Sequence, residues 1–476
     1  MANRSICFAL LLALISPAGA YLRLPALFGD NMVLQVGPQT PVYGKATPRA
    51  PVTVRFDGQS VEGRADENGN WRVDLNLPKA EGPFDLEIDG PGEQKVFHNV
   101  LVGEVWVCSG QSNMEWSYHD AKIAHQSIDI GGANRPQLRL FTVAHAVSKD
   151  PLNEPQGKWV VCTPDTMNPF SLLGYFFGAG LQDRLGCPVG MIESDWGGTP
   201  AESWTPRETL ESSPNLRPLI GSHVPIPVGA GEESGRPKPE RAACVLYNGM
   251  IHPILPFGFR GVIWYQGESN VGRAAQYREL FPAMIGAWRQ AAGRDFPFLF
   301  VQLANFETAP MVESQDAWAA LRDAQEAALK LPMTGMATAV DLAHASNIHW
   351  LQRSELGKRL DWLAMSTVYS QEKPAGGPVY RSMSVSGSEA RLVFDNKLNG
   401  LLIRSADGLS GFEIAGADRV FYPAFARIHD GDVIVSSPKV PVPVAVRYGW
   451  SDNPEISLYN SAGLPAPPFR TDDWGG

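Results

Sequence analysis

The hydrophobic pattern of the N-terminal part is that of short strands. From Met32 to about Val100, apolar and polar residues alternate in short runs that are separated by turn residues. Alternation with a period of two is typical of half-buried strands, and Asp-Gly and Asn-Gly pairs favour hairpin turns. The runs cover residues 52–56, 59–64 and 71–75, with turns at Asp57-Gly58 and Asn68-Gly69. This part is predicted to form a small β-sandwich.

The pattern changes at about Glu104 and again near Ser370. Between them, strand-like apolar runs alternate with longer segments that carry an apolar stripe at helical spacing. The strand-like runs cover residues 105–108, 189–193, 261–265, 298–303 and 336–341, and the helical segments cover 276–292, 317–329 and 354–369. About five strands with intervening helices predict an α/β fold with a doubly wound parallel sheet.

A second β-rich part follows residues 374–378, which read PAGGP. Its strand-like runs, at residues 390–394, 433–435 and 444–448, are separated by Gly, Asp and Pro. The predicted organisation is an N-terminal β-sandwich at 21–103, an α/β domain at 104–373 and a C-terminal β module at 374–476.

Residues 1–20 have the pattern of a secretory signal peptide. Arg4 precedes an apolar run over residues 6–15, and Ala18-Gly19-Ala20 forms a small-residue cleavage site. The run is shorter than the ~20 residues of a membrane span, and no later segment reaches that length without charge or proline. We therefore expect a mature chain that is secreted or lumenal, in the periplasm, outside the cell or in a lysosome.

Composition narrows the possible partners. The 476 residues include 40 Lys and Arg against 50 Asp and Glu, for a net charge of -10, and the basic residues are scattered along the chain. This pattern lacks the basic surface of nucleic-acid-binding proteins. Removal of the signal leaves Cys108, Cys162, Cys187 and Cys244, which permit one or two disulfides in an oxidising compartment. The pairing and the oligomeric state stay open.

Small or polar residues follow four of the five predicted strands. Ligands of open α/β sheets bind beyond the carboxyl ends of the strands, so these residues are the first to consider for a site. They are Ser109-Gly110-Gln111-Ser112-Asn113, Trp196-Gly197-Gly198-Thr199, Gln266-Gly267-Glu268-Ser269-Asn270, and Asp341 with Asn347-Ile348-His349. Their coincidence at successive strand ends favours one shared site.

The residue types at these strand ends suit nucleophilic catalysis. Ser112 lies in a Gly-containing turn where a hydroxyl is held rigid and exposed, and His349 follows the last predicted strand, where doubly wound hydrolases supply a base. The backbone N–H groups of Ser112 and Gly198, with the Gln266 amide, are candidate donors to an oxyanion. Glu268 is interpreted as a buried structural carboxylate rather than an acid.

Structural interpretations compete with each of these assignments. Ser112 in a strand–helix turn could be a helix N-cap, and Gly197-Gly198 could be only a tight turn. His344, five residues before His349, competes with it as the base.

Five segments in order resemble the sialate O-acetylesterase family, a branch of the SGNH hydrolases, across about 450 residues. They are LFGDNMVLQ at residues 27–35, GEVWVCSGQSNMEW at 103–116, WGGTPAESW at 196–204, LYNGMIHPILPFGFRGVIWYQGESN at 246–270 and VRYGWSDNPEISLYNSAGLPAPPFR at 446–470. The resemblance implies an SGNH-type parallel sheet flanked by β modules.

The resemblance also implies an activity, which is hydrolysis of O-acetyl esters on sugars, above all 9-O-acetyl sialic acids, without metal or organic cofactor. Ser112 matches the nucleophile of the family, His349 the base and Gly198 the oxyanion glycine. Gln266 matches a position that is asparagine in many SGNH enzymes.

Two departures from the family pattern surround His349. Trp350 stands where a proline commonly follows the histidine, and Ser346 and Asn347 stand where an aspartate is often found. Asp341 is the nearest upstream carboxylate, so it is one candidate to orient His349. The alternative is a dyad, in which a backbone carbonyl near Asn347 holds the imidazole and Asp341 caps the loop.

The sequence separates the substrate classes poorly. A sialic acid carboxylate would favour a nearby arginine, and Arg241 or Arg322 could serve, although such residues also form ordinary salt bridges. An acetylxylan-type polysaccharide esterase is the close alternative. A secreted glycan-binding protein without catalysis, using aromatic residues on its β modules, is the alternative from another class.

Overall fold

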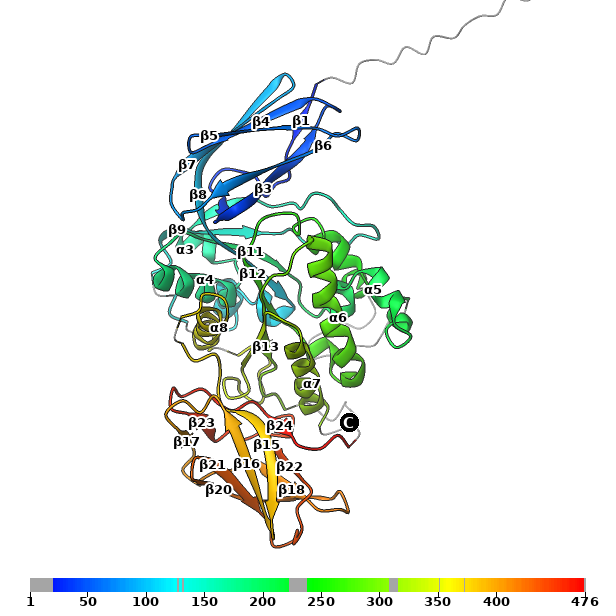
Figure 1. The fold of residues 1–476 in the computed structure, drawn as a ribbon, viewed down its shortest axis with the longest axis vertical. Helices are drawn as coiled ribbons and strands as arrows, with labels where there is room; N and C mark the ends of the chain where they lie inside the picture. Colours follow the sequence, from blue (N-terminus) through cyan, green and yellow to red (C-terminus); the bar gives the residue numbers. More distant parts are fainter. Residues whose placement is uncertain are drawn as a thin grey trace, which may run out of the picture.

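The computed structural model describes residues 20–125, 128–130, 132–221, 238–307, 316–350, 352–371 and 373–474. Figure 1 shows an elongated molecule with a β-rich part at the N-terminal end, an α/β part in the middle and another β-rich part at the C-terminal end. This mixed architecture agrees with the predicted class.

The central sheet is parallel apart from one edge. Its strands are β8 (Glu93–Gly110), β9 (Arg135–Thr142), β10 (Trp159–Cys162), β11 (Val189–Asp195), β12 (Gly261–Tyr265), β13 (Phe298–Gln302) and β14 (Thr334–Thr338). They lie in the order β10-β9-β11-β8-β12-β13-β14, and among these strands only β10 is antiparallel to its neighbour. The sequence analysis missed two of these strands, the four-residue β10 and β9, which begins with Arg135-Pro136 and carries no clean apolar run.

Strand β8 continues from the N-terminal module into the central sheet. Its first half pairs with β7 (Phe84–Gly90) and β2 (Val33–Gln35), and its second half pairs with β11 and β12. The predicted boundary between residues 103 and 104 therefore lies inside a strand. One hydrophobic core extends from Leu22 to Met365 across both parts. The N-terminal module therefore packs directly against the central sheet.

The rest of the N-terminal module follows the alternating pattern. Its other strands are β1 (Leu22–Arg23), β3 (Gly37–Ala46), β4 (Pro51–Phe56), β5 (Gln59–Arg64) and β6 (Asn70–Leu77). In β6 every second side chain is buried, which is the period-two pattern expected of a strand with one wet face.

Helices cover both faces of the central sheet. Figure 1 shows α4 (Leu172–Leu185) and α8 (Arg353–Thr367) on one side and α6 (Ala274–Ala292) and α7 (Ala317–Gln325) on the other. The predicted helices correspond to α6, α7 and α8. Helix α4 was not predicted because it is buried on most sides and lacks a polar stripe. The shorter helices are α1 (Ser112–Glu115), α2 (Tyr118–Ile123), α3 (Pro164–Met167) and α5 (Arg207–Ser212).

The C-terminal module has its own core, which includes Phe394, Ile414, Val433 and Tyr448. Its strands are β15 (Val379–Ser386), β16 (Glu389–Asp395), β17 (Leu401–Ile403), β18 (Phe412–Ala415), β19 (Phe421–Pro423), β20 (Phe425–His429), β21 (Asp432–Ser436), β22 (Ala445–Tyr448), β23 (Leu458–Asn460) and β24 (Phe469–Arg470). They form two four-stranded sheets and one two-stranded sheet.

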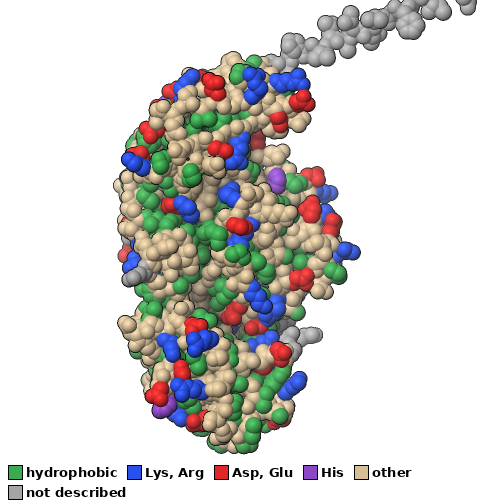
Figure 2. Space-filling view, viewed as in Figure 1, with side chains coloured by type: hydrophobic (Ala, Val, Ile, Leu, Met, Phe, Trp, Pro, Cys, Tyr) green, Lys and Arg blue, Asp and Glu red, His purple; other side chains and the backbone are tan. Residues whose placement is uncertain are grey.

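Four further expectations from the sequence can be compared with the structure. The signal peptide, residues 1–20, lies outside the described residues except for Ala20. Cys108, Cys162, Cys187 and Cys244 are all free thiols, so the described structure contains neither of the disulfides that the count permitted. None of the described helices is long and apolar enough to cross a membrane. Figure 2 shows acidic and basic side chains interspersed on the viewed face, in keeping with their scatter along the chain.

Candidate active site

Ser112 lies at the carboxyl end of the central sheet. The last residue of β8, Gly110, pairs with Asp195 at the end of β11 and with Tyr265 at the end of β12. Gly110 has φ of 144°, and a Cβ there would lie 2.0 Å from the Tyr265 carbonyl oxygen, so a side chain has no room. The chain therefore turns sharply after the strand, and Ser112 begins α1.

The structure brings Ser112 and His349 together. His349 Nε2 lies 3.0 Å from Ser112 Oγ, although the two residues are 237 positions apart. Trp116 stacks on the imidazole at a ring separation of 4.2 Å and an interplanar angle of 18°. The competing residue His344 is exposed, and its Nδ1 lies 2.9 Å from Ser346 Oγ. The geometry therefore favours His349 as the partner of Ser112.

The surroundings of His349 keep its imidazole neutral. Burial, together with the positive charge of Arg353, lowers its pKa to about 4, while Asp120 acts in the opposite direction. A neutral imidazole at Nε2 can accept the hydroxyl proton of Ser112. The site is therefore suited to general-base catalysis from mildly acidic to neutral pH.

A buried polar network lies next to Ser112 and His349. Arg353 donates to the Asn113 side-chain oxygen, and the Asn113 amide donates to Glu268. The guanidinium of Arg353 also lies 4.6 Å from the ring of Trp350, which is itself buried. Trp350, the departure from the family proline, thus packs inside this network. Glu268 is buried, as interpreted, and burial raises its pKa while the Asn113 hydrogen bond lowers it.

The loop after β11 lies against Ser112. Gly197 donates its N–H to Glu115 Oε2 at 2.6 Å, and Thr199 Oγ1 donates to the Trp196 carbonyl at 2.7 Å. Gly198 has φ of 70°, in the left-handed region that favours glycine. These contacts define the oxyanion loop, residues 196–199, in which the Gly198 N–H is the candidate donor.

The side-chain amide of Gln266, a candidate oxyanion donor, is hydrogen-bonded within the protein. The side chain is fully buried, and Nε2 donates to the Thr199 carbonyl at 3.3 Å and to Asn270 Oδ1 at 2.7 Å. Its Oε1 accepts a hydrogen bond from Tyr277 at 3.1 Å. Both amide hydrogens are thus engaged with the protein, which disfavours a direct donation to the oxyanion. Gln266 instead holds the end of the oxyanion loop.

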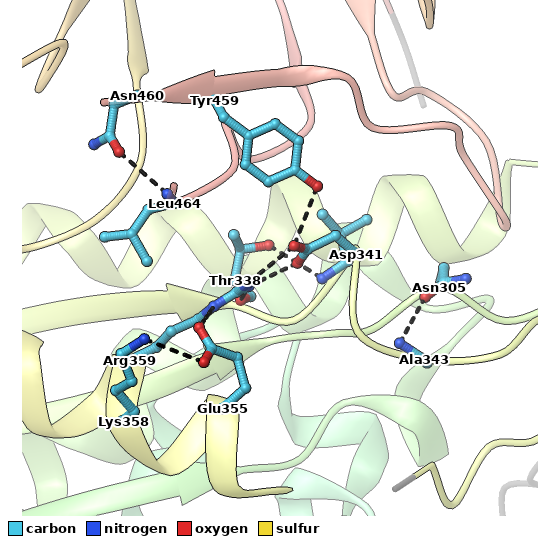
Figure 3. Close-up of polar contacts among 11 residues, drawn as sticks. Asn305, Thr338, Asp341, Ala343, Glu355, Lys358, Arg359, Tyr459, Asn460 and Leu464 are labelled. Carbon is cyan, nitrogen blue, oxygen red and sulfur yellow. Dashed lines mark hydrogen bonds and ion pairs between the residues drawn. The ribbon is translucent and has the colours of Figure 1, made fainter. Parts of the chain in front are cut away.

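Asp341 was expected, as one alternative, to orient His349, and the structure places it elsewhere. Figure 3 shows its carboxylate directed at Arg359 and Tyr459. Arg359 binds both oxygens, at 2.6 and 2.8 Å, and the Tyr459 hydroxyl donates at 3.3 Å from the C-terminal module. These contacts favour the alternative in which Asp341 holds the loop that leads to His349 and does not orient the imidazole.

The two arginines proposed for substrate binding lie outside the described site. Arg322 is fully buried, and its guanidinium donates to the carbonyls of Leu303, Ala304, Ser451 and Asp452. It therefore joins the end of β13 to the C-terminal module and cannot receive a substrate carboxylate. Arg241 ends the short 3-10 helix Pro239–Arg241 and is not among the described residues that line the cavity at Ser112.

A cavity of about 430 Å³ opens at Ser112. The described residues that line it are Ser112, Glu115, Trp116, Ser117, His119, Asp120 and Pro169. Apart from Ser112, the sequence analysis missed them, although Glu115 and Trp116 belong to the same SNMEW stretch as Ser112. A larger cavity of about 660 Å³ lies near Arg23, Lys45 and Asn153 and does not include Ser112.

No group of three or more His, Cys, Asp or Glu suited to a metal occurs in the described chain.

Comparison with known proteins agrees with this geometry. Residues 102–365 match the family model described as carbohydrate esterase, sialic acid-specific acetylesterase. The chain belongs to this family. The resemblance inferred from the sequence motifs is thereby confirmed. A member of this carbohydrate esterase family is a carboxylic ester hydrolase acting on O-acetylated sugars, so the predicted enzyme class is confirmed as well.

Individual relatives cover nearly the whole chain. Sialate O-acetylesterase from Mus musculus is 30% identical over 520 residues, covering 95% of this chain and 94% of the relative. The corresponding protein from Homo sapiens is 29% identical over 513 residues, covering 95% and 93%. The crystal structure of a carbohydrate acetylesterase from Xanthomonas citri has a TM-score of 0.84 and 38% identity, covering 95% of this chain and 100% of that one.

Proposed function

We propose that this carbohydrate esterase is a serine esterase of the SGNH type that removes O-acetyl groups from sugars through an acetyl-enzyme. The observation that carries the proposal is the 3.0 Å contact between Ser112 Oγ and His349 Nε2 at the carboxyl end of the parallel sheet. The described cavity at Ser112 provides the entrance for the ester.

The proposed reaction has two steps. Ser112 Oγ attacks the acetyl carbonyl carbon while His349 Nε2 takes the hydroxyl proton, and the backbone N–H groups of Ser112 and Gly198 stabilise the oxyanion. His349 then returns the proton to the sugar oxygen as the carbon–oxygen ester bond breaks. Water, deprotonated by His349, attacks the acetyl-enzyme, and acetate leaves as Ser112 recovers its proton.

Two substrate classes are candidates for this chemistry. The names of the mammalian relatives favour O-acetylated sialic acids, the class to which the expected 9-O-acetyl sialosides belong. The cavity favours the second class, neutral acetylated sugars of the xylan type, because Glu115 and Asp120 are among its described lining residues and no described Arg or Lys is. Acetate release from a 9-O-acetyl sialoside and from acetylated xylan, measured side by side, separates the two.

The proposal extends to organisation and location. The signal pattern of residues 1–20 supports export of the mature chain to a secreted or lumenal compartment. The separate core of the last module supports a C-terminal module at 374–476, whereas the modules proposed at 21–103 and 104–373 share one core and strand β8. Limited proteolysis and N-terminal sequencing of the exported protein test both points.

Substitution of the nucleophile tests the mechanism. Ser112→Ala should lower kcat on p-nitrophenyl acetate by roughly 10^3-fold or more with an unchanged thermal midpoint, because nucleophile and base act as one unit. An organophosphonate should label Ser112, read by mass spectrometry. His349→Ala should match this loss within about tenfold, whereas the control His344→Ala should be mild. A non-catalytic glycan-binding protein would show neither turnover nor labelling.

A further inference from the structure

Glu115 connects the nucleophile helix to the oxyanion loop. It lies three residues after Ser112, at the end of α1, and its Oε2 accepts the Gly197 N–H at 2.6 Å. A Cβ added to Gly197 would lie 2.8 Å from this oxygen and 3.3 Å from Ser112 Cβ. The loop therefore packs directly against both residues, and the short bond to a carboxylate is of the stronger, charge-assisted kind.

His145 holds the other oxygen of the same carboxylate. Its Nε2 lies 3.2 Å from Glu115 Oε1 and 3.0 Å from the carbonyl oxygen of Asp195, the last residue of β11. The imidazole also stacks on Trp196, the first residue of the oxyanion loop, at a ring separation of 3.9 Å and an angle of 6°. His145 thus contacts both Glu115 and the start of the loop, and it comes from the segment after β9.

We propose that Glu115 and His145 are positioning residues for the oxyanion loop. Because Glu115 accepts the N–H of Gly197, the peptide group before it is fixed, and this limits the direction of the following Gly198 N–H. That N–H is the candidate oxyanion donor, so the proposal deepens the proposed function and rests on it. Gln266 holds the other end of the loop at Thr199.

Glu115 and His145 are partly exposed, so their ion pair is expected to contribute little to the stability of the fold. The side chains of Glu115 and His145 are 34% and 41% exposed, and ion pairs of this kind contribute about 0–1 kcal/mol to stability. The charged groups that interact with His145 are Glu115 and, within the sheet, Glu193, whereas Asp195 contacts it through the backbone carbonyl. Burial raises the pKa of both sheet carboxyls, which favours their neutral forms. Loss of the Glu115 carboxylate should therefore affect turnover far more than folding.

The test compares two variants of Glu115 with a matched surface control. Glu115→Ala should lower kcat on p-nitrophenyl acetate by about 10–100-fold with KM within twofold, because a misplaced donor loses part of the ~10²–10³ contribution of one oxyanion contact. Glu115→Gln retains an acceptor for Gly197 and should recover at least half of that loss on a logarithmic scale. His145→Ala should lower kcat by about three- to tenfold.

The control is Glu389→Ala, which removes an exposed ion pair with Arg427 in the C-terminal module and should leave kcat unchanged. The rate at which an organophosphonate labels Ser112 should fall with kcat in the Glu115 variants, since the tetrahedral adduct uses the same donors. Three results would each overturn the proposal: kcat of Glu115→Ala within threefold of wild type, a change in KM alone, or a fall in activity that the thermal midpoint fully accounts for. Failure of the proposed function would look different, because wild-type enzyme would then not be labelled at Ser112.

Discussion

Asp341→Asn is the substitution that best separates the structural interpretation of this residue from a catalytic one. The carboxylate and Arg359 form a two-point ion pair at 2.6 and 2.8 Å, with side chains that are only 11% and 6% exposed. Removing one partner of a buried pair typically costs about 3–5 kcal/mol, because the other charge stays buried. Arg359 retains the Thr338 carbonyl at 2.8 Å and lies 3.6 Å from Glu355, so a loss of about 2–4 kcal/mol is expected here.

This loss should appear in stability and not in turnover. At about 2–4 °C per kcal/mol, the thermal midpoint should fall by roughly 4–16 °C. The kcat at 25 °C should stay within about threefold of wild type, since Asp341 binds Arg359 and Tyr459 instead of the imidazole. A triad acid replaced by Asn would instead cost ~10^4 in kcat.

The assay pairs thermal denaturation followed by circular dichroism with kcat on p-nitrophenyl acetate, measured well below the midpoint. Tyr459→Phe serves as the control because it removes only the hydroxyl that reaches Asp341 from the C-terminal module, and it should cost about 0.5–1.5 kcal/mol with unchanged kcat. A 10^3-fold drop in kcat for Asp341→Asn with an unchanged midpoint would refute the reasoning and return Asp341 to the catalytic residues.

Two further predictions follow from the site. The acid limb of kcat/KM should lie near pH 4, because burial and Arg353 lower the pKa of His349 to about 4. The imidazole therefore stays neutral, and able to act as a base, at acidic pH. A limb near pH 6.5 in the measured pH profile would contradict this prediction. Gln266→Ala should lower the free energy of unfolding by about 1–3 kcal/mol in urea titrations, because the Thr199 carbonyl and Asn270 lose their buried partner. Unchanged stability with a ~10² loss of kcat would restore the amide as an oxyanion donor.

The sequence by itself determined the outline of the fold and the two candidate reacting residues. Apolar runs of strand length alternating with amphipathic helices require a buried parallel sheet, and the carboxyl ends of such strands meet at one edge. Ser112 and His349 were found because each follows a strand in the chain, which is a local property. Helix α4 was not predicted, because burial on most of its sides leaves no alternation of apolar and polar faces in its sequence.

Tertiary structure alone decided which polar side chains have their hydrogen-bonding groups occupied by other parts of the protein. Gln266 and Asp341 follow strands as Ser112 and His349 do, but their hydrogen-bonding capacity is used by Thr199, 67 residues away, and by Tyr459, 118 residues away. Conversely, Glu115 was passed over because its partner at Gly197 is 82 residues distant. A side chain's role depends on which donors and acceptors surround it, and those partners are set by packing between segments whose separation in the chain carries no information about their contact.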